Sequence, residues 1–324
     1  MTIVVEAPVV EAEPAEQGAP EAAPSSAPKG VPTPRSRNAQ LRLMFVAWFA
    51  AVVVGLALVM YGFGPLFHQR DQRRLQNEYR GAIDRAANEA TGLGGVTVAS
   101  HAPSPGSPVG ILEIASIRFQ EAVVEGVNPS DTRQGPGHVP GTAGLGQPGN
   151  AAVVGRNKAF GGSFAHLDEV ATGDEILVTT TQGQSVYVVD DVKRAAISTT
   201  GDGASADEVF GPSTDDRLTL VTSASAMPWN GSDARIVTAK LKTVAFAPTP
   251  QGGFDLEAIG TSGDRSALAS VILALLVYGI VLGGSVALYR RASPRTAYLL
   301  TAAPIIAVTI IAAETMSRLF PAWL

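Results

Sequence analysis

Three uncharged apolar blocks interrupt a chain in which polar and apolar residues are otherwise mixed. They occupy residues 43–63, 267–289 and 297–313. As helices, the first two are long enough to cross a hydrocarbon core of about 30 Å, whereas the third is shorter and contains Pro304. We therefore predict a membrane-anchored chain with three transmembrane helices.

After the first block the pattern becomes that of an amphipathic helix. Charges are spread over residues 68–91, and apolar side chains recur every three to four residues, at Leu75, Tyr79, Ile83, Ala86 and Ala90. This spacing places the apolar side chains on one face of a helix. Glycines at 92–95 favour its end, so we predict a stalk helix and linker over residues 64–107.

Residues 108–243 have a different pattern, made of short runs in which apolar and polar positions alternate. The runs are rich in β-branched residues and are separated by Gly, Pro, Asp and Asn, which is typical of strands and turns. They span residues 110–115, 121–125, 151–154, 175–179, 185–190, 218–222 and 235–240. We predict an all-β barrel of about seven or eight strands, with short helices near 163–170 and 204–210.

The remaining segments carry weaker patterns. Residues 1–40 are rich in Ala, Pro and Glu and poor in large apolar side chains, so they bury too little surface to offset the entropy of ordering. We predict a disordered cytoplasmic tail there and a linker at 244–266. Arginines crowd residues 290–296, and a short basic loop favours the cytoplasmic side.

This loop sets the expected topology. The N-terminus and the basic loop are cytoplasmic, while the β domain and a C-terminal tail at residues 314–324 are extracellular. The chain is then a multi-pass protein of the cell membrane.

Composition narrows the chemistry further. The chain contains no cysteine, which excludes disulfides, thiolate metal sites and thiol catalysis. A net charge of −5 gives no indication of nucleic-acid binding. The glycine-rich run 135–149 lacks the Gly-Lys-Ser/Thr ending of a phosphate loop, and no oxygen-rich loop has calcium-ligand spacing. We expect neither a metal nor another cofactor.

The β domain nevertheless resembles a known family, the sortases, which are membrane-anchored cysteine transpeptidases of the Gram-positive cell surface. The likeness covers residues 108–241 in order. It is carried by Val-Gly-Ile-Leu-Glu-Ile at 109–114, Gly-Pro-Gly-His-Val-Pro-Gly-Thr at 135–142, Gly-Asp-Glu-Ile at 173–176, Leu-Thr-Leu-Val-Thr at 218–222 and Arg-Ile-Val at 235–237.

The resemblance also implies where the reactive groups would lie. Sortases use a cysteine nucleophile, a histidine acid and an arginine that steadies the substrate. Ser223 stands at the cysteine position and Arg156 at the histidine position, while Arg235 keeps the arginine. A serine hydroxyl is a poor nucleophile without a general base, and a guanidinium stays protonated at physiological pH.

We therefore expect a catalytically inactive sortase homologue. Its expected partners are the membrane and a sorting-signal peptide, a surface protein or an active sortase. If Arg156 and Arg235 face the groove as fixed cations, the site would favour an anion. The alternative is that Asp233 or another acid pairs with them and the groove is inert. His138 and His166 are expected to be structural or surface residues. Two alternatives remain: a peptidase or transpeptidase with Ser223 as nucleophile, and a membrane-assembly scaffold acting through the C-terminal helical hairpin.

Overall fold

The computed structural model of the chain describes residues 46, 49–50, 53–93, 100–198, 204–225, 233–253 and 265–319. The predicted tail at 1–40 lies outside these residues, as do residues 43–45, 47–48 and 51–52 of the first apolar block. The helical elements are η1 (Leu58–Phe63), α2 (Gly64–Leu93), η2 (Ala115–Ile117), η3 (Ala159–Gly161), η4 (Leu167–Glu169), α3 (Ala206–Phe210), η7 (Arg265–Ala267), α4 (Leu268–Arg291) and α5 (Pro294–Ser317). The strands are β1 (Pro108–Ile114), β2 (Phe119–Glu125), β3 (Gly137–His138), β4 (Asn150–Val154), β5 (Glu175–Thr180), β6 (Gly183–Ser198), β7 (Ala204–Ser205), β8 (Arg217–Ser223) and β9 (Asp233–Leu241).

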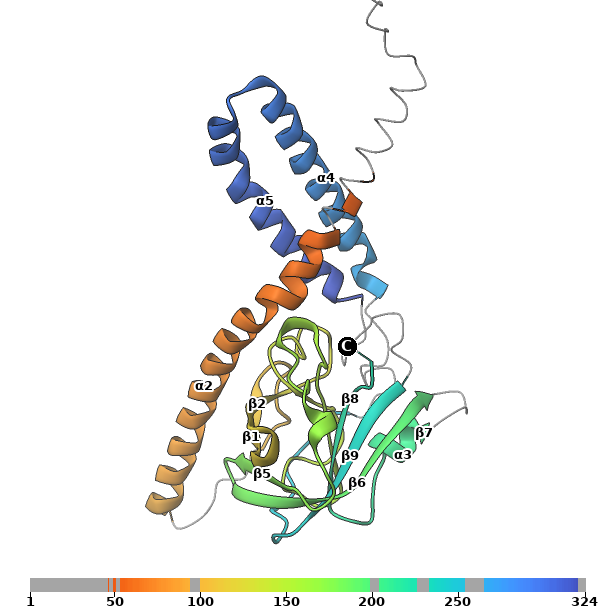
Figure 1. Ribbon diagram of the computed structural model, residues 1–324. Helices are drawn as coiled ribbons and strands as arrows, with labels where there is room; N and C mark the ends of the chain where they lie inside the picture. Colours follow the sequence, from red (N-terminus) through yellow and green to blue (C-terminus); the bar gives the residue numbers. More distant parts are fainter. Residues whose placement is uncertain are drawn as a thin grey trace, which may run out of the picture. The chain divides into compact units, whose positions relative to one another are not determined.

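Eight of these strands close into a barrel. They are hydrogen-bonded in the order β5-β1-β2-β3-β4-β8-β9-β6, and an antiparallel β5–β6 pairing joins the two ends. The short β7 pairs with the far end of β6, outside this ring. Figure 1 shows the barrel strands together, with α2 beside β1 and β2. The predicted all-β barrel is confirmed.

Alternation along the strands sorts side chains into two packed layers, because successive residues of a strand point to opposite faces. On β8, Leu218 and Leu220 belong to the main core, together with Val153 and Tyr187. The next residue, Val221, faces the other way. It packs in a second cluster with side chains from α3, β4 and β9, namely Val209, Phe210, Ala152, Val154, Ala234 and Ile236.

A bulge in β6 carries the sheet beyond the barrel. The pairing of β6 with β9 shifts register between Val189 and Asp191. An extra residue of this kind bends a strand and increases its twist. The distal part of β6 continues along β9, where Arg194 lies opposite Arg235.

The two short helices predicted inside the barrel domain differ from expectation in extent. The stretch 163–170 contains only the 3₁₀ turn η4, which ends where Val170 adopts an extended backbone conformation. The stretch 204–210 divides into β7 and α3. There Ser205 caps the helix by accepting a hydrogen bond from the Glu208 amide.

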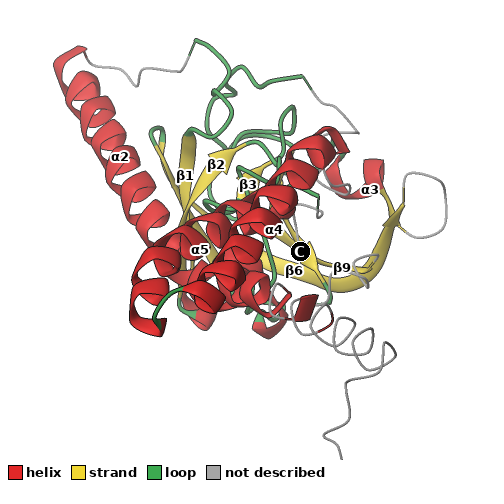
Figure 2. Cartoon of the chain, turned by 90° about the horizontal axis from the view of Figure 1, so that it is seen from above, coloured by secondary structure: helices red, strands yellow, loops and turns green. Residues whose placement is uncertain are grey.

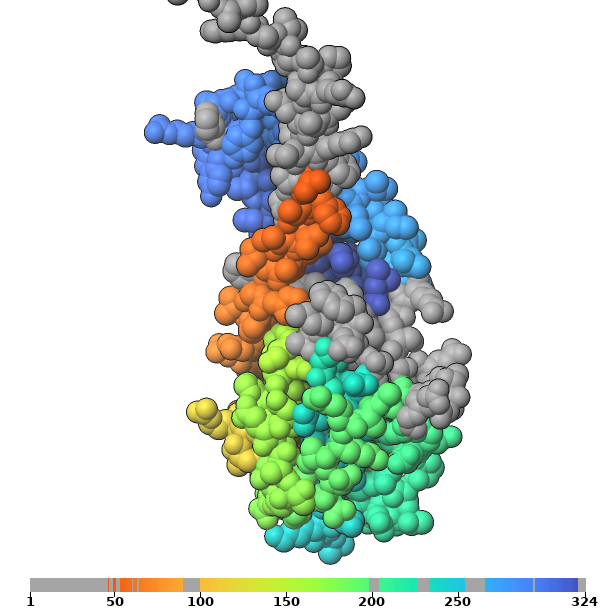
Figure 3. Space-filling model, turned by 45° about the vertical axis from the view of Figure 1, so that its right-hand side comes forward, coloured from red at the N-terminus to blue at the C-terminus, as the bar shows by residue number. Residues whose placement is uncertain are grey.

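The long helix α2 packs against the barrel through a stripe of side chains with four-three-four spacing. The stripe consists of His68, Gln72, Leu75 and Tyr79, all buried. The Gln72 amide bonds to both backbone groups of Ala122, with Ala122 N–H donating to Oε1 at 2.8 Å and Nε2 donating to the carbonyl at 3.1 Å. Figure 2 shows α2 beside β1, and Figure 3 shows its orange atoms against the barrel surface.

Both ends of this stripe are fixed by polar contacts. The Tyr79 hydroxyl donates to the Val109 carbonyl at 2.7 Å, and His68 Nε2 lies 2.7 Å from Glu121 Oε1. Burial alone would lower the pKa of His68, but the hydrogen bond and charge of Glu121 outweigh it, so the pKa is raised. Leu75 and Tyr79 are thus on the buried face that the sequence pattern predicts.

Two C-terminal helices are long and apolar enough to cross a membrane. They are Leu268–Arg291 and Arg295–Ser317, the two candidates among the described residues. Three transmembrane helices are therefore not shown. Within the first predicted span, residues 43–45, 47–48 and 51–52 lie outside the described part of the chain. The link between α4 and α5 is only residues 292–293, shorter than the predicted loop at 290–296, since the flanking arginines continue the helices.

Candidate functional site at the end of strand β8

Ser223 is the last residue of β8, and its hydroxyl is engaged by the backbone. The side chain is almost fully buried. Its Oγ donates to the carbonyl oxygen of Ser225 at 2.8 Å and accepts from the Ser225 N–H at 3.2 Å. The neighbouring Asn157 donates from Nδ2 to the Ser223 carbonyl at 2.8 Å. The hydroxyl proton therefore points to a carbonyl oxygen. A backbone carbonyl cannot act as a general base that removes this proton.

All four histidines of the chain lie in described segments, and each has a partner away from Ser223. His68 contacts Glu121, and His138 contacts Glu125 at 2.8 Å. On the surface, His166 contacts Glu169 at 2.8 Å, and His101 contacts the neighbouring Ser100. None of these imidazoles is hydrogen-bonded to the Ser223 hydroxyl.

His138 belongs to a different part of the barrel. Its Nδ1 faces the Glu125 carboxylate, and its Nε2 lies 2.9 Å from the Ala143 carbonyl. The ladder pairs His138 with Val153 and Val153 with Leu220. His138 is thus two strands away from β8 and level with a position three residues before Ser223. Strand spacing and rise per residue then place the His138 and Ser223 backbones on the order of 14 Å apart.

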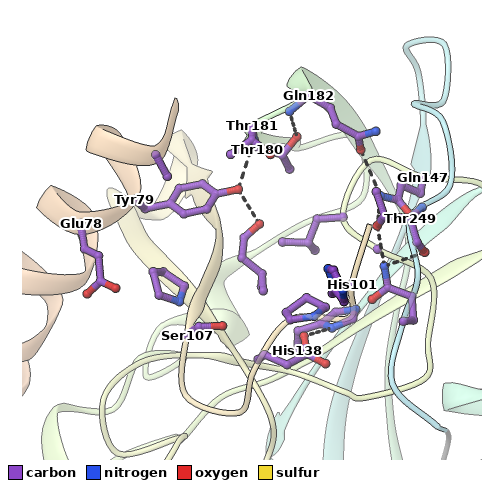
Figure 4. Close-up of a pocket in the computed structure, with 18 of the residues that line it drawn as sticks. Glu78, Tyr79, His101, Ser107, His138, Gln147, Thr180, Thr181, Gln182 and Thr249 are labelled. Carbon is purple, nitrogen blue, oxygen red and sulfur yellow. Dashed lines mark hydrogen bonds and ion pairs between the residues drawn. The ribbon is translucent and has the colours of Figure 1, made fainter. Parts of the chain in front are cut away.

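His138 instead lines a cavity of about 350 Å³ that α2 helps to enclose. Figure 4 shows His138 there with Tyr79, Gln147 and Thr249, of which Gln147 and Thr249 bond to each other. Gln147 Nε2, for example, donates to Thr249 Oγ1 at 2.8 Å, while Thr249 N–H donates to Gln147 Oε1 at 3.0 Å. These bonds hold the segment after β9 against the barrel.

Arg156 is buried rather than exposed to the pocket beside Ser223. Its side chain is 1% exposed, and its guanidinium lies 5.3 Å from the centre of the Phe160 ring. Nη2 donates to the Pro129 carbonyl at 2.8 Å, while Nε and Nη1 have no partner among the described residues. Burial lowers the pKa of Arg156 to about 10, so it remains a cation at neutral pH.

The expectation that Arg156 and Arg235 face one groove is therefore corrected. The chain turns inward directly after β4, where the Phe164 N–H donates to the Arg156 carbonyl at 2.9 Å. This turn directs the Arg156 side chain beneath η3. Arg156 is absent from the lining of the pocket that contains Ser223 and Arg235.

That pocket is small and carries an excess of positive charge. It has a volume of about 190 Å³ and includes Ser223 among its lining residues. Its charged lining residues are Lys158, Arg194, Arg235 and Asp168. In the described part of the chain, none of the three cations forms an ion pair within 4.0 Å.

Two of these cations form a row with a threonine across three strands. Thr222 on β8 lies opposite Arg235 on β9, which lies opposite Arg194 on β6. Directly opposed residues of antiparallel strands share a face, and like charges there repel. The Thr222 hydroxyl is buried and has no partner among the described residues. The row therefore offers two guanidiniums and one hydroxyl to an anion.

The sequence analysis identified Arg235 but not Arg194, Lys158 or Thr222. Arg194 becomes its neighbour only through the bulge at Val189–Asp191, which alternation along the chain does not reveal. Lys158 lies two residues after Arg156, in a turn whose direction the sequence does not indicate. The described residues also hold no group of three or more His, Cys, Asp or Glu that could bind a metal.

Comparison with known proteins bears on this site. Residues 112–242 match the family model of the sortase domain. Comparison with curated proteins gave no match. Among solved structures, the chain is similar to a Clostridium perfringens sortase D5 transpeptidase, with 21% identity, a TM-score of 0.44, and coverage of 54% of this chain and 99% of that chain. It is also similar to Streptomyces avermitilis sortase E, with 28% identity, a TM-score of 0.37, and coverage of 43% and 91%.

Proposed function

Since residues 112–242 of this chain are a sortase domain, we propose that the protein is a sortase homologue that binds a surface peptide or protein at the cell envelope without transferring it. The proposal assigns a binding role to the pocket beside Ser223. Arg235 and Arg194 are its main contacts, and Ser223 lies at the margin. Arg156 supports the neighbouring turn from the interior.

The observation that carries this proposal is the state of the Ser223 hydroxyl. Attack on a peptide carbonyl requires a group that accepts the hydroxyl proton. The Ser223 proton is directed to the Ser225 carbonyl, and the four imidazoles are paired elsewhere. General acid–base assistance is typically worth about 10²–10⁴-fold in rate, so its loss together with the thiolate leaves little acyl transfer.

The charge of the pocket supports an anionic ligand group. Arg194 and Arg235 lie opposite each other and have no carboxylate partner among the described residues, so they repel each other, and an anion between them removes that repulsion. Arginine also presents paired N–H donors that fit a carboxylate or a phosphate. A peptide with a free carboxylate, or one carrying a phosphate, would meet both requirements.

Attachment to the membrane is the second part of the proposal. The apolar helices α4 and α5 support it, and the arginines at their connection favour a cytoplasmic position for that link. The sortase domain would then lie on the outer face of the membrane. There it would meet surface proteins and their sorting signals.

A fluorophosphonate probe, which labels activated serine hydroxyls, tests the absence of catalysis. Full-length protein and the Ser223→Ala variant are labelled in parallel, and the adduct is located by peptide mass spectrometry. We expect equal, background labelling in both. Labelling of Ser223 in the native protein, lost in the variant, would overturn the proposal and favour a serine peptidase or transpeptidase.

A membrane scaffold is a second candidate function, and one contact favours it. A side-chain carbon at Gly55 would lie 3.2 Å from the Tyr278 hydroxyl and 3.6 Å from Thr309. The helix before α2 therefore packs closely on the α4–α5 hairpin. Co-purification of envelope proteins with full-length protein, but not with a variant ending at residue 253, would support a scaffold whose partner binds the hairpin.

A further inference from the structure

The exposed surface of the helix leading into α2 changes from apolar to cationic within about two turns. Upstream and at the start of α2, the exposed side chains are apolar, namely Val53, Val54, Leu58, Tyr61, Leu66 and Phe67. Directly after them, Arg70, Arg73 and Arg74 are exposed. Such a change is expected where a helix passes from lipid to water.

A pocket lies at this boundary. Arg70 and Arg74 are one helical turn apart on α2, and Arg133 approaches from the loop after β2. With Phe67 and Asp71 they line a space of about 240 Å³. Three guanidiniums against one carboxylate leave an excess of positive charge, next to an aromatic side chain that is 40% exposed.

The pocket's own charges do not neutralise one another. In the described part of the protein, Arg70 and Arg74 have no ion pair within 4.0 Å, and Arg133 has only a 3.7 Å contact with Glu314. Both members of that pair are partly exposed, and such a pair contributes little. Burial lowers the pKa of Arg156, and the nearby charge of Arg133 lowers that pKa further. The region therefore favours an incoming anion.

Its position beside α5 matches the depth of a lipid headgroup. Glu314, the partner of Arg133, lies one turn before the end of α5 at Ser317. The upstream helix packs against the same hairpin at Gly55. Two apolar helices thus end near this pocket, so a membrane that surrounds them would place its phosphates at the level of the arginines.

We propose that Arg70, Arg74 and Arg133 form a site for the headgroup phosphate of an anionic phospholipid, with an acyl chain lying along Phe67 and Leu66. This inference rests on the membrane attachment proposed above. Bidentate N–H pairs suit the phosphate oxygens. Occupation of the site would hold α2, and the barrel docked on it, at a defined height over the bilayer.

Native mass spectrometry of full-length protein in detergent tests the site with two lipids, phosphatidylglycerol and phosphatidylcholine. We expect the native protein to retain phosphatidylglycerol preferentially. The Arg70→Gln/Arg74→Gln variant should lose roughly tenfold or more in apparent affinity for it. The control Arg80→Gln/Arg85→Gln removes the same charge from a later part of the same helix and should bind like the native protein.

Three outcomes would overturn the proposal. One is equal retention of phosphatidylglycerol by all three proteins, and another is equal retention of the two lipids by the native protein. The third is full displacement of the lipid by inorganic phosphate at equal concentration, which would indicate a free-anion site. Circular dichroism of the lipid-free variants checks that they fold. Fluorophosphonate labelling at Ser223 is independent of these readings, so either proposal can fail alone.

Discussion

At the scale of single residues, the proposed loss of acyl transfer depends on the hydrogen bond of one hydroxyl group. The Ser223 hydroxyl donates to a backbone carbonyl, and the resemblance to sortases places Arg156, a guanidinium, at the histidine position. Among the residues that the structure describes, that buried guanidinium makes one hydrogen bond, to the Pro129 carbonyl, and two of its nitrogens have no partner. Arg156 and Arg235, which the sequence treats alike, therefore have different roles.

Because of this difference, we expect substitutions of the pocket arginines to weaken peptide binding and a substitution of the buried Arg156 to leave it unchanged. Arg194→Gln or Arg235→Gln should weaken binding of a peptide with a free C-terminal carboxylate by roughly tenfold, because each removes a charge-assisted hydrogen bond. Arg156→Met should leave that binding unchanged. Isothermal titration with the carboxylate peptide and its amidated form measures both effects. Equal loss in all three variants would contradict the assignment.

The same Arg156→Met variant should also be at least as stable as the native protein. Burying an incompletely paired charge is costly, and replacing it with an apolar side chain of similar length is often neutral or stabilising by about 1–4 kcal/mol. The contact with Phe160 would be retained. Arg156→Ala is the matched control and should lower the thermal midpoint, because it leaves a cavity. A thermal midpoint for Arg156→Met below that of the native protein would contradict this account.

At the scale of elements, α2 is attached to the barrel by a side chain that makes the backbone hydrogen bonds a neighbouring strand would make to β2. Gln72 supplies the donor and the acceptor that the Ala122 backbone would otherwise lack, and it also donates to the Gln134 carbonyl at 2.9 Å. Buried backbone groups without partners are costly. The register of α2 on the barrel therefore depends on this side chain as well as on Leu75 and Tyr79.

Substituting Gln72 tests this dependence. Gln72→Ala should reduce the free energy of unfolding by about 2–4 kcal/mol, because it leaves buried donors and acceptors unpaired. Gln76→Ala is the control one turn later. The Gln76 side chain donates to the Gln120 carbonyl at 3.2 Å in an exposed position, so its loss should cost less than about 0.5 kcal/mol. Thermal unfolding and hydrogen exchange at the Ala122 amide compare the two variants. Equal losses of stability would contradict the role assigned to the Gln72 hydrogen bonds.

At the scale of the whole molecule, α4 and α5 are the described helices that are long and apolar enough to cross a membrane. Ser293 caps α5 by accepting a hydrogen bond from the Thr296 N–H. Deeper in the hairpin, the Thr309 hydroxyl lies 3.2 Å from the Tyr278 hydroxyl. The arginines at 290, 291 and 295 all cluster at the turn. This concentration of charge predicts that the turn stays in the cytoplasm.

Single cysteines can report this topology without background, because the chain has no native thiol. We expect a membrane-impermeant maleimide to label Thr172→Cys, at an exposed barrel position, in intact cells. Ala292→Cys, in the turn between α4 and α5, should react only after the membrane is permeabilised. Labelling of Ala292→Cys in intact cells would reverse the proposed orientation.

The sequence alone was sufficient for the barrel, because strand alternation is local. The alternation of Leu218, Leu220 and Val221 predicts which side chains share a face of the strand. The lengths of the two apolar C-terminal blocks predict helices long enough to cross a membrane. It was also sufficient to place Ser223 and Arg235 on neighbouring strands, through their motifs. Each of these features depends on residues adjacent in the chain.

Tertiary structure decided the features that depend on distant residues. The β6 bulge places Arg194 beside Arg235, and the turn after β4 takes Arg156 away from them into the interior. Gln72 and His68 look like solvated polar residues in the sequence, yet the barrel buries them on β2. Side-chain direction and burial depend on packing between segments far apart in the chain, and no local pattern encodes that packing.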